Sequence, residues 1–442
     1  MLKRLILALA VLLLAGAGCT AAWVWTHRTE PRTETTRGSS TREFVTTGRA
    51  KPEKPKRPQK VVRKVPWPTY GFDSARSHVA ADFEHRPPYR RTWLVETGNL
   101  IEFPPVVAYD KLYVAQVKGR FLAIDAETGK IAWERRFGHC EASSPTVWRG
   151  IVFMTFMQAL PCDRGDRSQR GFLVAMDADT GKILWRFEAG AIESSPLLVR
   201  GTLYFGSWDH RVYAVNARTK TLRWSFEADD EVNTSVAYSE GAIFFATDAG
   251  SVYSLDARTG RVRWERHDGS EYFYATPAVA YGRVYIGNTN GALYAYGARS
   301  GDLLWVAHAG TYVYTAAAVW NRTVYVGSYD GGFYAFDAAT GNRKWRYEAP
   351  SAIHGAPTVM AGLVYFSSCE FCGIRASRYA KQGPRGTYAL DARSGRLVWQ
   401  SKAGQYSPIV ADDERVYLTG KTRVYALETI RRYRGRKLRP AA

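Results

Sequence analysis

The sequence predicts an all-β fold, an eight-bladed β-propeller of four-stranded blades, preceded by an N-terminal transmembrane helix. A tryptophan recurs through residues 93–399 with steps of 40, 52, 39, 40, 41, 40 and 54 residues. A short turn motif precedes most of these tryptophans, and the first and last units are incomplete in complementary ways. A repeat of about 40 residues is typical of propeller blades. The eight tryptophans are Trp93, Trp133, Trp185, Trp224, Trp264, Trp305, Trp345 and Trp399.

The N-terminus is expected to be a membrane anchor. Residues 1–4 contain two basic side chains and precede an uncharged apolar run over residues 5–25. That run is long enough to cross a bilayer core as a helix, so we expect a cytoplasmic stub followed by a signal anchor. Two alternatives stay open. The segment could be cleaved after Ala17, or the chain could be cut and lipidated at Cys19, where Gly-Ala-Gly-Cys is similar to a lipoprotein signal.

Basic segments flank the predicted propeller on both sides. Residues 26–66 are rich in Pro, Thr and basic side chains, and we expect a disordered linker. It could contact anionic lipid or wall polymer, or serve only as a solvated spacer. Residues 431–442 form a basic tail with six Lys or Arg. These ends carry most of the formal net charge of +20, and the tail lacks the aromatic pattern of single-strand binders, so we expect no nucleic acid partner.

Each unit between residues 67 and 430 predicts four short strands, because β-branched and aromatic residues alternate between Gly- and Asp-containing turns. The turn before the tryptophan strand follows the pattern Asp-Ala-x-Thr/Ser-Gly, with Asn216 and Gly297 replacing the Asp in two units and Lys220 replacing the Gly in one. Asp suits a tight turn by accepting backbone N–H groups, and Gly supplies a positive φ. We expect each tryptophan to pack between neighbouring blades.

The two ends of the array predict ring closure. Residues 89–97 form a tryptophan strand with no preceding strands, and the last unit, residues 407–427, lacks a tryptophan strand. We therefore expect residues 89–97 to pair with residues 422–427 and complete the eighth blade, which leaves no free sheet edge.

The motif Asp-Ala-x-Thr-Gly-x-x-x-Trp resembles the pyrroloquinoline-quinone-like (PQQ-like) propeller repeat family over residues 89–430. Within it the chain looks most like the BamB-type eight-bladed assembly lipoproteins, which implies a protein-interaction scaffold of the bacterial envelope. The motif residues are structural, so the resemblance bears on fold more than on function.

The cysteines indicate the cellular compartment of the propeller. Two units carry extra residues, about 158–171 and 370–386, which we expect on one face of the ring. Cys140 and Cys162 flank neighbouring strands there, and we expect a disulfide between them. Cys369 and Cys372 form a CxxC for which a local disulfide, a zinc site and a redox pair stay open. Disulfides persist outside the cytosol, so we expect an extracytoplasmic, monomeric propeller with envelope protein partners on this long-loop face.

A ring of aligned residues is the candidate binding site. Glu193 and Asn233 are similar to the calcium ligands of quinoprotein alcohol dehydrogenases, which implies PQQ with calcium, but Tyr274 stands where those enzymes place an Asp base. Alternatively, the ring lines a water-filled channel. We predict no catalytic residue, metal ligand or cofactor. The ring consists of Glu102, Ala142, Glu193, Asn233, Tyr274, Tyr314, His354 and Gln405.

The function predicted from the sequence is a membrane-anchored, non-enzymatic scaffold or ligand-binding propeller. The chain has no Gly-rich phosphate loop and no serine nucleophile motif. Two alternatives stay open: a PQQ-dependent oxidoreductase, and a sensor that binds a glycan or wall fragment on the aromatic segments 272–274 and 312–314.

Overall fold

The computed structural model describes residues 63–162, 170–268, 272–370, 380–407 and 409–430, with the backbone of residues 432–433 and 436–437. The predicted anchor, nearly all of the linker, Cys19 and Cys372 lie outside these residues. In the described ranges there is no helix both long and apolar enough to span a bilayer.

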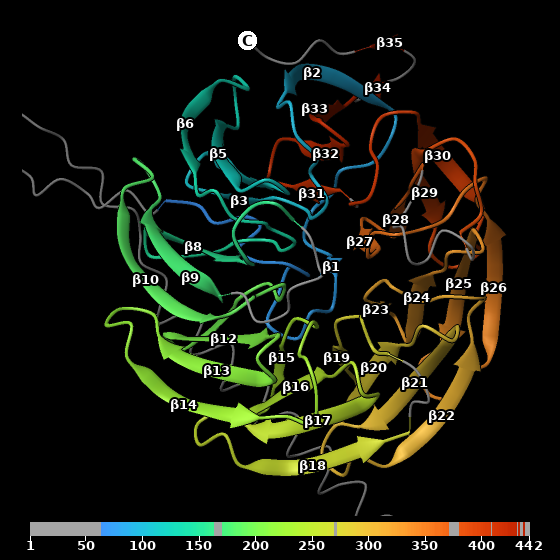
Figure 1. Cartoon of the computed structure of the whole chain (residues 1–442). Coiled ribbons are helices and arrows are strands. Elements are labelled where there is room, and N and C mark those ends of the chain that lie inside the picture. The colour runs from blue at the N-terminus through green and yellow to red at the C-terminus, as the bar shows by residue number, and fades with distance from the viewer. Residues whose placement is uncertain are drawn as a thin grey trace, which may run out of the picture. The chain divides into compact units, whose positions relative to one another are not determined.

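Eight blades of four antiparallel strands are arranged radially around one axis (Figure 1), which confirms the predicted propeller, and the short strand β1 (Val79–Ala80) adds a fifth strand to one of them. The innermost strands are β3 (Val106–Ala108), β7 (Thr146–Trp148), β11 (Leu197–Val199), β15 (Ala237–Ser239), β19 (Ala278–Ala280), β23 (Ala318–Trp320), β27 (Thr358–Met360) and β31 (Val410–Ala411). The second strands are β4 (Lys111–Gln116), β8 (Ile151–Phe156), β12 (Thr202–Ser207), β16 (Ala242–Ala246), β20 (Arg283–Gly287), β24 (Thr323–Gly327), β28 (Leu363–Ser368) and β32 (Val416–Gly420).

The third strands are β5 (Arg120–Asp125), β9 (Arg170–Asp177), β13 (Arg211–Asn216), β17 (Ser251–Asp256), β21 (Ala292–Gly297), β25 (Gly332–Asp337), β29 (Gly386–Asp391) and β33 (Arg423–Thr429). The outer strands are β6 (Ile131–Arg136), β10 (Ile183–Gly190), β14 (Leu222–Glu227), β18 (Val262–His267), β22 (Leu303–His308), β26 (Arg343–Glu348), β30 (Leu397–Ser401) and β2 (Tyr89–Glu96). In the basic tail, β34 (Arg432–Tyr433) pairs with β35 (Arg436–Lys437).

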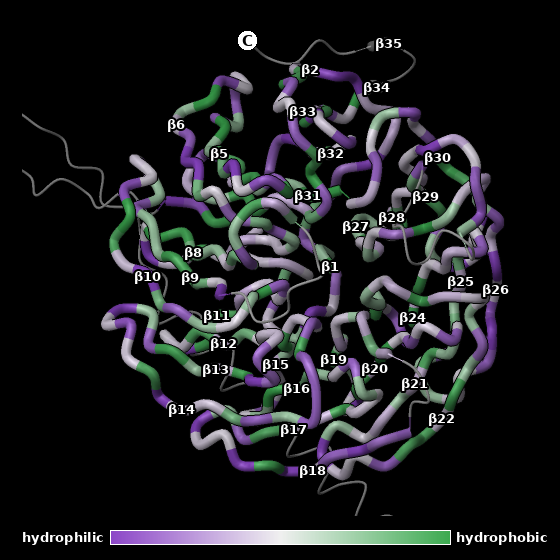
Figure 2. Tube along the Cα trace, viewed as in Figure 1, coloured by the Kyte–Doolittle hydropathy of each residue, from purple (hydrophilic) through white to green (hydrophobic). Residues whose placement is uncertain are grey.

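The hydrophobic core lies between the blades, at their second and third strands. Every residue of β16 is buried, whereas most residues of the outer strand β18 are exposed. Figure 2 shows the same gradient, with hydrophilic residues frequent along outer strands such as β18 and β26. The inner strands have continuous apolar runs because both of their faces are buried. In the outer strands apolar and polar residues alternate because one face is exposed to solvent.

Six of the eight repeated tryptophans join their blade to the next through the turn motif. Trp224 Nε1 donates to the carbonyl oxygen of Ala257 at 3.1 Å, and its ring lies against Gly260 of that turn. A Cβ on Gly260 would be 2.8 Å from the indole, so the close approach requires Gly. The same bond joins Trp93 to Ala126, Trp133 to Ala178, Trp264 to Ala298, Trp305 to Ala338 and Trp345 to Ala392.

The unit that lacks the Gly also lacks this contact. Lys220 takes the Gly position with φ 54°. Among the described residues, Trp185 of the preceding blade makes no indole hydrogen bond to Ala217, the residue equivalent to Ala257. The turn motif and the tryptophan therefore act as a pair across the blade boundary.

The N-terminal outer strand closes the ring. β2 pairs antiparallel with β33, with Trp93 opposite Ala426 and Glu96 opposite Arg423. The Arg423 guanidinium also lies 2.6 Å from the Glu96 carboxylate. The predicted closure is confirmed, because this pairing leaves the eighth blade with four strands.

Sequence analysis missed a segment that plugs the centre of the ring. Residues 67–80 wind past the innermost strands, and their carbonyl oxygens accept backbone N–H groups from six of them, starting at Val107 and ending at Val359. Trp67 forms a bridge with Val107, and β1 (Val79–Ala80) lies parallel to β27 near the centre of Figure 1. Just before the plug, the Lys64 carbonyl oxygen accepts the Tyr109 N–H, and the Arg63 guanidinium lies 2.6 Å from the Asp179 carboxylate.

Candidate functional site

Six of the ring candidates line one pocket at the mouth of the propeller axis. Its free volume is about 50 Å³. A cavity needs about 10–15 Å³ of such volume to hold one water molecule, so the pocket holds only a few water-sized groups. The lining residues are Tyr70, Glu102, Phe103, Pro104, Glu193, Asn233, Ser235, Tyr274, Thr276, Tyr314, Thr315, His354, Gly355, Ala356 and Ser407.

The pocket has a floor, supplied by the plug. Tyr70 lines the pocket and is buried, and the Arg76 guanidinium lies 5.5 Å from its ring. Arg76 is fully buried and donates to the carbonyl oxygens of Val236 and Ser195 at 3.1 and 3.2 Å. Bonds from one side chain to two blades hold the plug in place. The alternative of an open water-filled channel is therefore corrected to a blind pocket.

A chain of side-chain hydroxyls supports the mouth. Ser195 Oγ accepts from the N–H of Ser144, Ser235 Oγ from that of Ser195, and Thr276 Oγ1 from that of Ser235, at 2.9 to 3.2 Å. Each bond joins consecutive blades near the start of an inner strand. These residues are buried, so the bonds are shielded from water and fix the spacing of the ring above them.

One half of the mouth is acidic. Asn233 donates through one amide nitrogen to both carboxylate oxygens of Asp248 at 2.8 Å. Burial, with a smaller contribution from the nearby carboxylates of Glu231 and Glu193, raises the pKa of Asp248 to about 7, although the Asn233 hydrogen bond lowers it. Sequence analysis missed Asp248. The signal was present in the alignment, because Asp248 stands where the preceding unit has Trp208 and the following unit has Thr289.

The other half of the mouth is aromatic. The Tyr314 ring stacks on His354 with centroids 4.6 Å apart and lies 5.9 Å from Tyr274. His354 is held from both ring nitrogens, by the Tyr329 hydroxyl at 2.7 Å and by Glu102 Oε1 at 3.3 Å. Burial raises the pKa of Tyr329 well above its usual value, so it stays a neutral phenol. His354 and Glu102 link the two halves.

Two ring positions do not reach the pocket. Ala142 is buried and apolar. Gln405 is buried, and its amide donates to the carbonyl oxygen of Glu370 in the long loop at 3.1 Å. Beside Ala142, Glu141 is buried, and burial together with the nearby Glu102 carboxylate raises the pKa of Glu141 to about 8. Sequence analysis missed this carboxyl.

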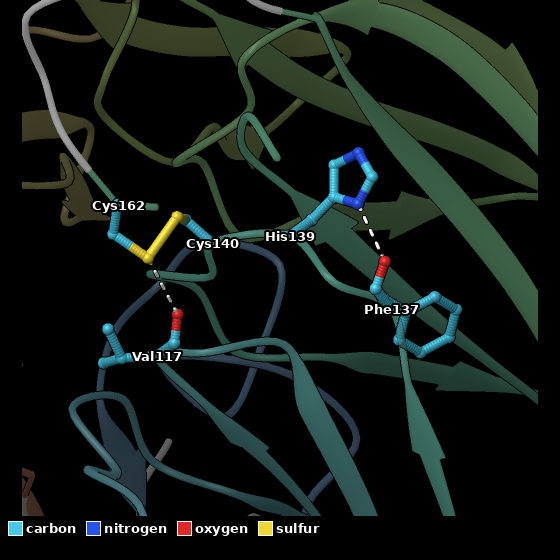
Figure 3. Close-up of a disulfide and its surroundings, with 5 residues drawn as sticks. All are labelled: Val117, Phe137, His139, Cys140 and Cys162. Carbon is cyan, nitrogen blue, oxygen red and sulfur yellow. Dashed lines mark hydrogen bonds between the residues drawn. A yellow bond between two sulfur atoms is a disulfide. The ribbon is translucent and has the colours of Figure 1, made fainter. Parts of the chain in front are cut away.

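A disulfide joins Cys140 and Cys162 on the long-loop face (Figure 3), with their Cα atoms 5.5 Å apart. Cys162 Sγ lies 3.6 Å from the Val117 carbonyl oxygen, a polar contact in which a bridged sulfur has no hydrogen to donate. The bridge fastens the start of one long loop to the neighbouring blade. Cys369 is buried, and because Cys372 lies outside the described residues, the pairing of the CxxC stays a prediction.

The described residues do not fit the quinone cofactor that the sequence resemblance implied. Pyrroloquinoline quinone has three fused rings and three carboxylates, whereas the pocket offers about 50 Å³ and is lined by Glu102 and Glu193. No Lys or Arg among the described residues lines the pocket to balance those charges. Tyr274 offers a phenol where a base is needed. The described residues also contain no group of three or more His, Cys, Asp or Glu arranged to hold a metal ion.

Comparison with known proteins identifies the family. The model of the outer membrane protein assembly factor BamB family matches residues 87–191, 169–376 and 308–430, which covers nearly all of the propeller. The chain belongs to this family. The family assignment agrees with the sequence resemblance and with the short, repeated blades.

Curated relatives match only parts of the chain. BamB from Burkholderia pseudomallei (strain K96243) is 30% identical over 133 residues, which is 30% of this chain and 32% of that protein. Quinohemoprotein alcohol dehydrogenase ADH IIB from Pseudomonas putida is 37% identical over 83 residues, 18% of this chain and 11% of the enzyme. The chain thus matches no more than a third of the length of either relative.

Solved structures show the same fold at low identity. BamB from Moraxella catarrhalis superposes with a TM-score of 0.61 and 15% identity over 77% of this chain and all of that one. A europium-containing methanol dehydrogenase superposes with a TM-score of 0.65 and 14% identity over 82% of this chain and 98% of the enzyme chain. At such identities the likeness concerns fold alone.

Proposed function

We propose that this protein is a non-enzymatic protein-interaction scaffold of the bacterial envelope, held outside the cell membrane by residues 5–25. The blind pocket supports this proposal most, because a plug below and a volume of about 50 Å³ leave little room for a substrate with a cofactor. The closed ring offers broad faces for protein partners instead. Cys162 and Glu370 each follow the end of a second strand, β8 and β28, so the described starts of the two long loops and the disulfide share one face, which is the proposed docking face.

Partner capture from intact cells of the native host tests the scaffold role. The full chain is crosslinked in place, and its partners are compared with those of the charge reversals Glu370→Lys, on the long-loop face, and Glu240→Lys, on the opposite face. Both carboxylates pair with an arginine at the surface, so the substitutions are matched. We expect Glu370→Lys alone to reduce recovery. Equal recovery by both variants would contradict docking on the long-loop face.

The membrane anchor has its own test. We expect the full chain to stay in the membrane pellet after a wash in 1 M salt, because salt screens the basic linker but not an apolar helix. A chain lacking residues 1–25 should be released by the same wash. Intact propeller in the soluble fraction, starting near Gly18, would show cleavage instead of anchoring.

The second candidate is a PQQ-dependent oxidoreductase, favoured by the alcohol dehydrogenase relatives. Purified protein would be mixed with pyrroloquinoline quinone and calcium and assayed for dye-linked alcohol oxidation. Stoichiometric quinone binding with turnover would replace the scaffold proposal. We expect neither, since the described pocket is small and acidic.

A further inference from the structure

The small axial pocket has the size of a side-chain head group. Its free volume of about 50 Å³ is too small to enclose a cofactor or a sugar ring but admits one compact ionic group. A lysine ammonium is such a group, strongly hydrated and carried on a flexible four-carbon stem. The planar guanidinium of arginine is broader and less suited to a pocket of this volume.

Carboxylates dominate the charge of the pocket, and His354, which lies 3.3 Å from Glu102 Oε1, is the one basic side chain among the described residues that line it. Glu102 and Glu193 line it, and Asp248 lies directly behind Asn233. The nearest buried guanidinium, that of Arg76, lies below the Tyr70 floor and is directed at backbone carbonyls. Burial is the main cause of the raised pKa of Asp248, and the nearby carboxylates of Glu231 and Glu193 add their repulsion to it. A bound cation would relieve that repulsion.

An unsatisfied acceptor points to the same chemistry. Asn233 is 9% exposed and lines the pocket. Its amide nitrogen donates hydrogen bonds to the Asp248 carboxylate, and this fixes the orientation of the amide. Its Oδ1 atom has no hydrogen-bond partner. A buried acceptor without a donor is costly, and an ammonium group has three donors and no acceptor.

The aromatic half suits the stem and the charge of a lysine. Tyr274 and Tyr314 line the pocket opposite the carboxylates. Tyrosine faces attract a cation and pack against methylene groups, whereas a small metal ion would require more oxygen ligands. The partly exposed Tyr272, 6.0 Å from Tyr274, extends this surface outward.

We propose that the mouth pocket binds the ammonium group of a lysine side chain presented by a protein partner. The acidic half, the free Asn233 oxygen and the tyrosine faces would surround the head group and stem. This inference rests on the proposed scaffold function, in which the lysine anchors a partner at the centre of the face.

Binding of end-blocked peptides to the full chain in detergent tests the inference. The probes are Gly-Gly-Lys-Gly-Gly, the same peptide with Nε-acetyl-lysine, and spermidine, measured by calorimetry. We expect the lysine peptide to bind and the acetylated peptide to bind at least tenfold more weakly. Equal binding of the two peptides would overturn the inference. If spermidine binds more than tenfold more tightly than the lysine peptide, the ligand is a free polyamine and not the side chain of a protein partner.

Variants keep the test specific. Glu102→Gln removes a charge at the pocket and Glu240→Gln removes one at a distant exposed ion pair, so they are matched. Glu102→Gln and Asn233→Leu should each weaken lysine-peptide binding at least tenfold, with Glu240→Gln unchanged. Unaltered binding by both pocket variants, each with a parental melting curve, would refute the assignment. Crosslinked partners that persist without any lysine-peptide binding would refute the inference and leave the scaffold function standing.

Discussion

Replacing Gly260 by Ala tests the interlock between the turn motif and the tryptophan of the preceding blade. Gly260 has φ +73°, and an added Cβ would lie 2.8 Å from two ring atoms of Trp224. Left-handed backbone costs a non-glycine residue roughly 1–2 kcal/mol. Displacing the indole adds about 1–3 kcal/mol of overpacking and weakens its 3.1 Å bond to Ala257. We expect a net loss of about 2–4 kcal/mol.

The unit in which Lys replaces the turn Gly supplies the control for the Gly260→Ala experiment. Lys220 holds the Gly260 position of its own unit with φ 54°. Lys220→Gly should relieve the backbone strain and leave space for Trp185 to approach the turn. Added freedom of glycine in the unfolded chain offsets part of this gain, so we expect a stabilisation of about 1 kcal/mol or less.

Urea unfolding of the full chain in detergent, followed by tryptophan fluorescence, measures both changes. A shift of the midpoint at constant slope reports stability. Gly260→Ala should lower the midpoint and Lys220→Gly should raise it. If Gly260→Ala unfolds like the parent, the indole does not depend on a glycine at this turn and the proposed reason for the motif is wrong.

A chain that begins at Gly98 lacks both the plug and β2, and its thermal midpoint should fall far below that of the parent; a parental melt would contradict the closure of the ring. The folded-state pKa of Asp248, about 7, exceeds its ordinary 3.8, so ionising this carboxyl costs stability as pH rises from about 4 to 7. Asp248→Asn should therefore stabilise the protein at pH 8 by up to about 4 kcal/mol and change little at pH 4, and equal effects at both pH values would contradict the shift. Non-reducing peptide mapping of native protein should recover Cys140 linked to Cys162, whereas alkylation of both thiols before reduction would remove the bridge and the argument for an extracytoplasmic propeller.

The repeat was predictable because its causes are local. The turn Asp accepts hydrogen bonds from groups two or three residues away, as Asp125 Oδ1 does from the N–H of Thr128 at 2.8 Å. The tryptophan pairs with a turn that lies one repeat ahead, about 33 residues from Trp224 to Ala257. The spacing of the motif along the chain is therefore enough to predict the blades, their register and the strand that the last unit lacks. The same alignment brought Glu193, Asn233 and Tyr274 to one pocket.

Tertiary structure alone decided what that pocket is. The plug, residues 67–80, has no periodic pattern, because its partners are single backbone groups on blades 40 to nearly 300 residues away. Its Tyr70 turns a channel into a blind pocket, and no local signal indicates that. The charges of Asp248 and Glu141 likewise depend on burial among carboxylates from other blades. A repeating sequence determines its repeat by short-range bonds, whereas the chemistry at the axis is set by long-range contacts that the repeat does not encode.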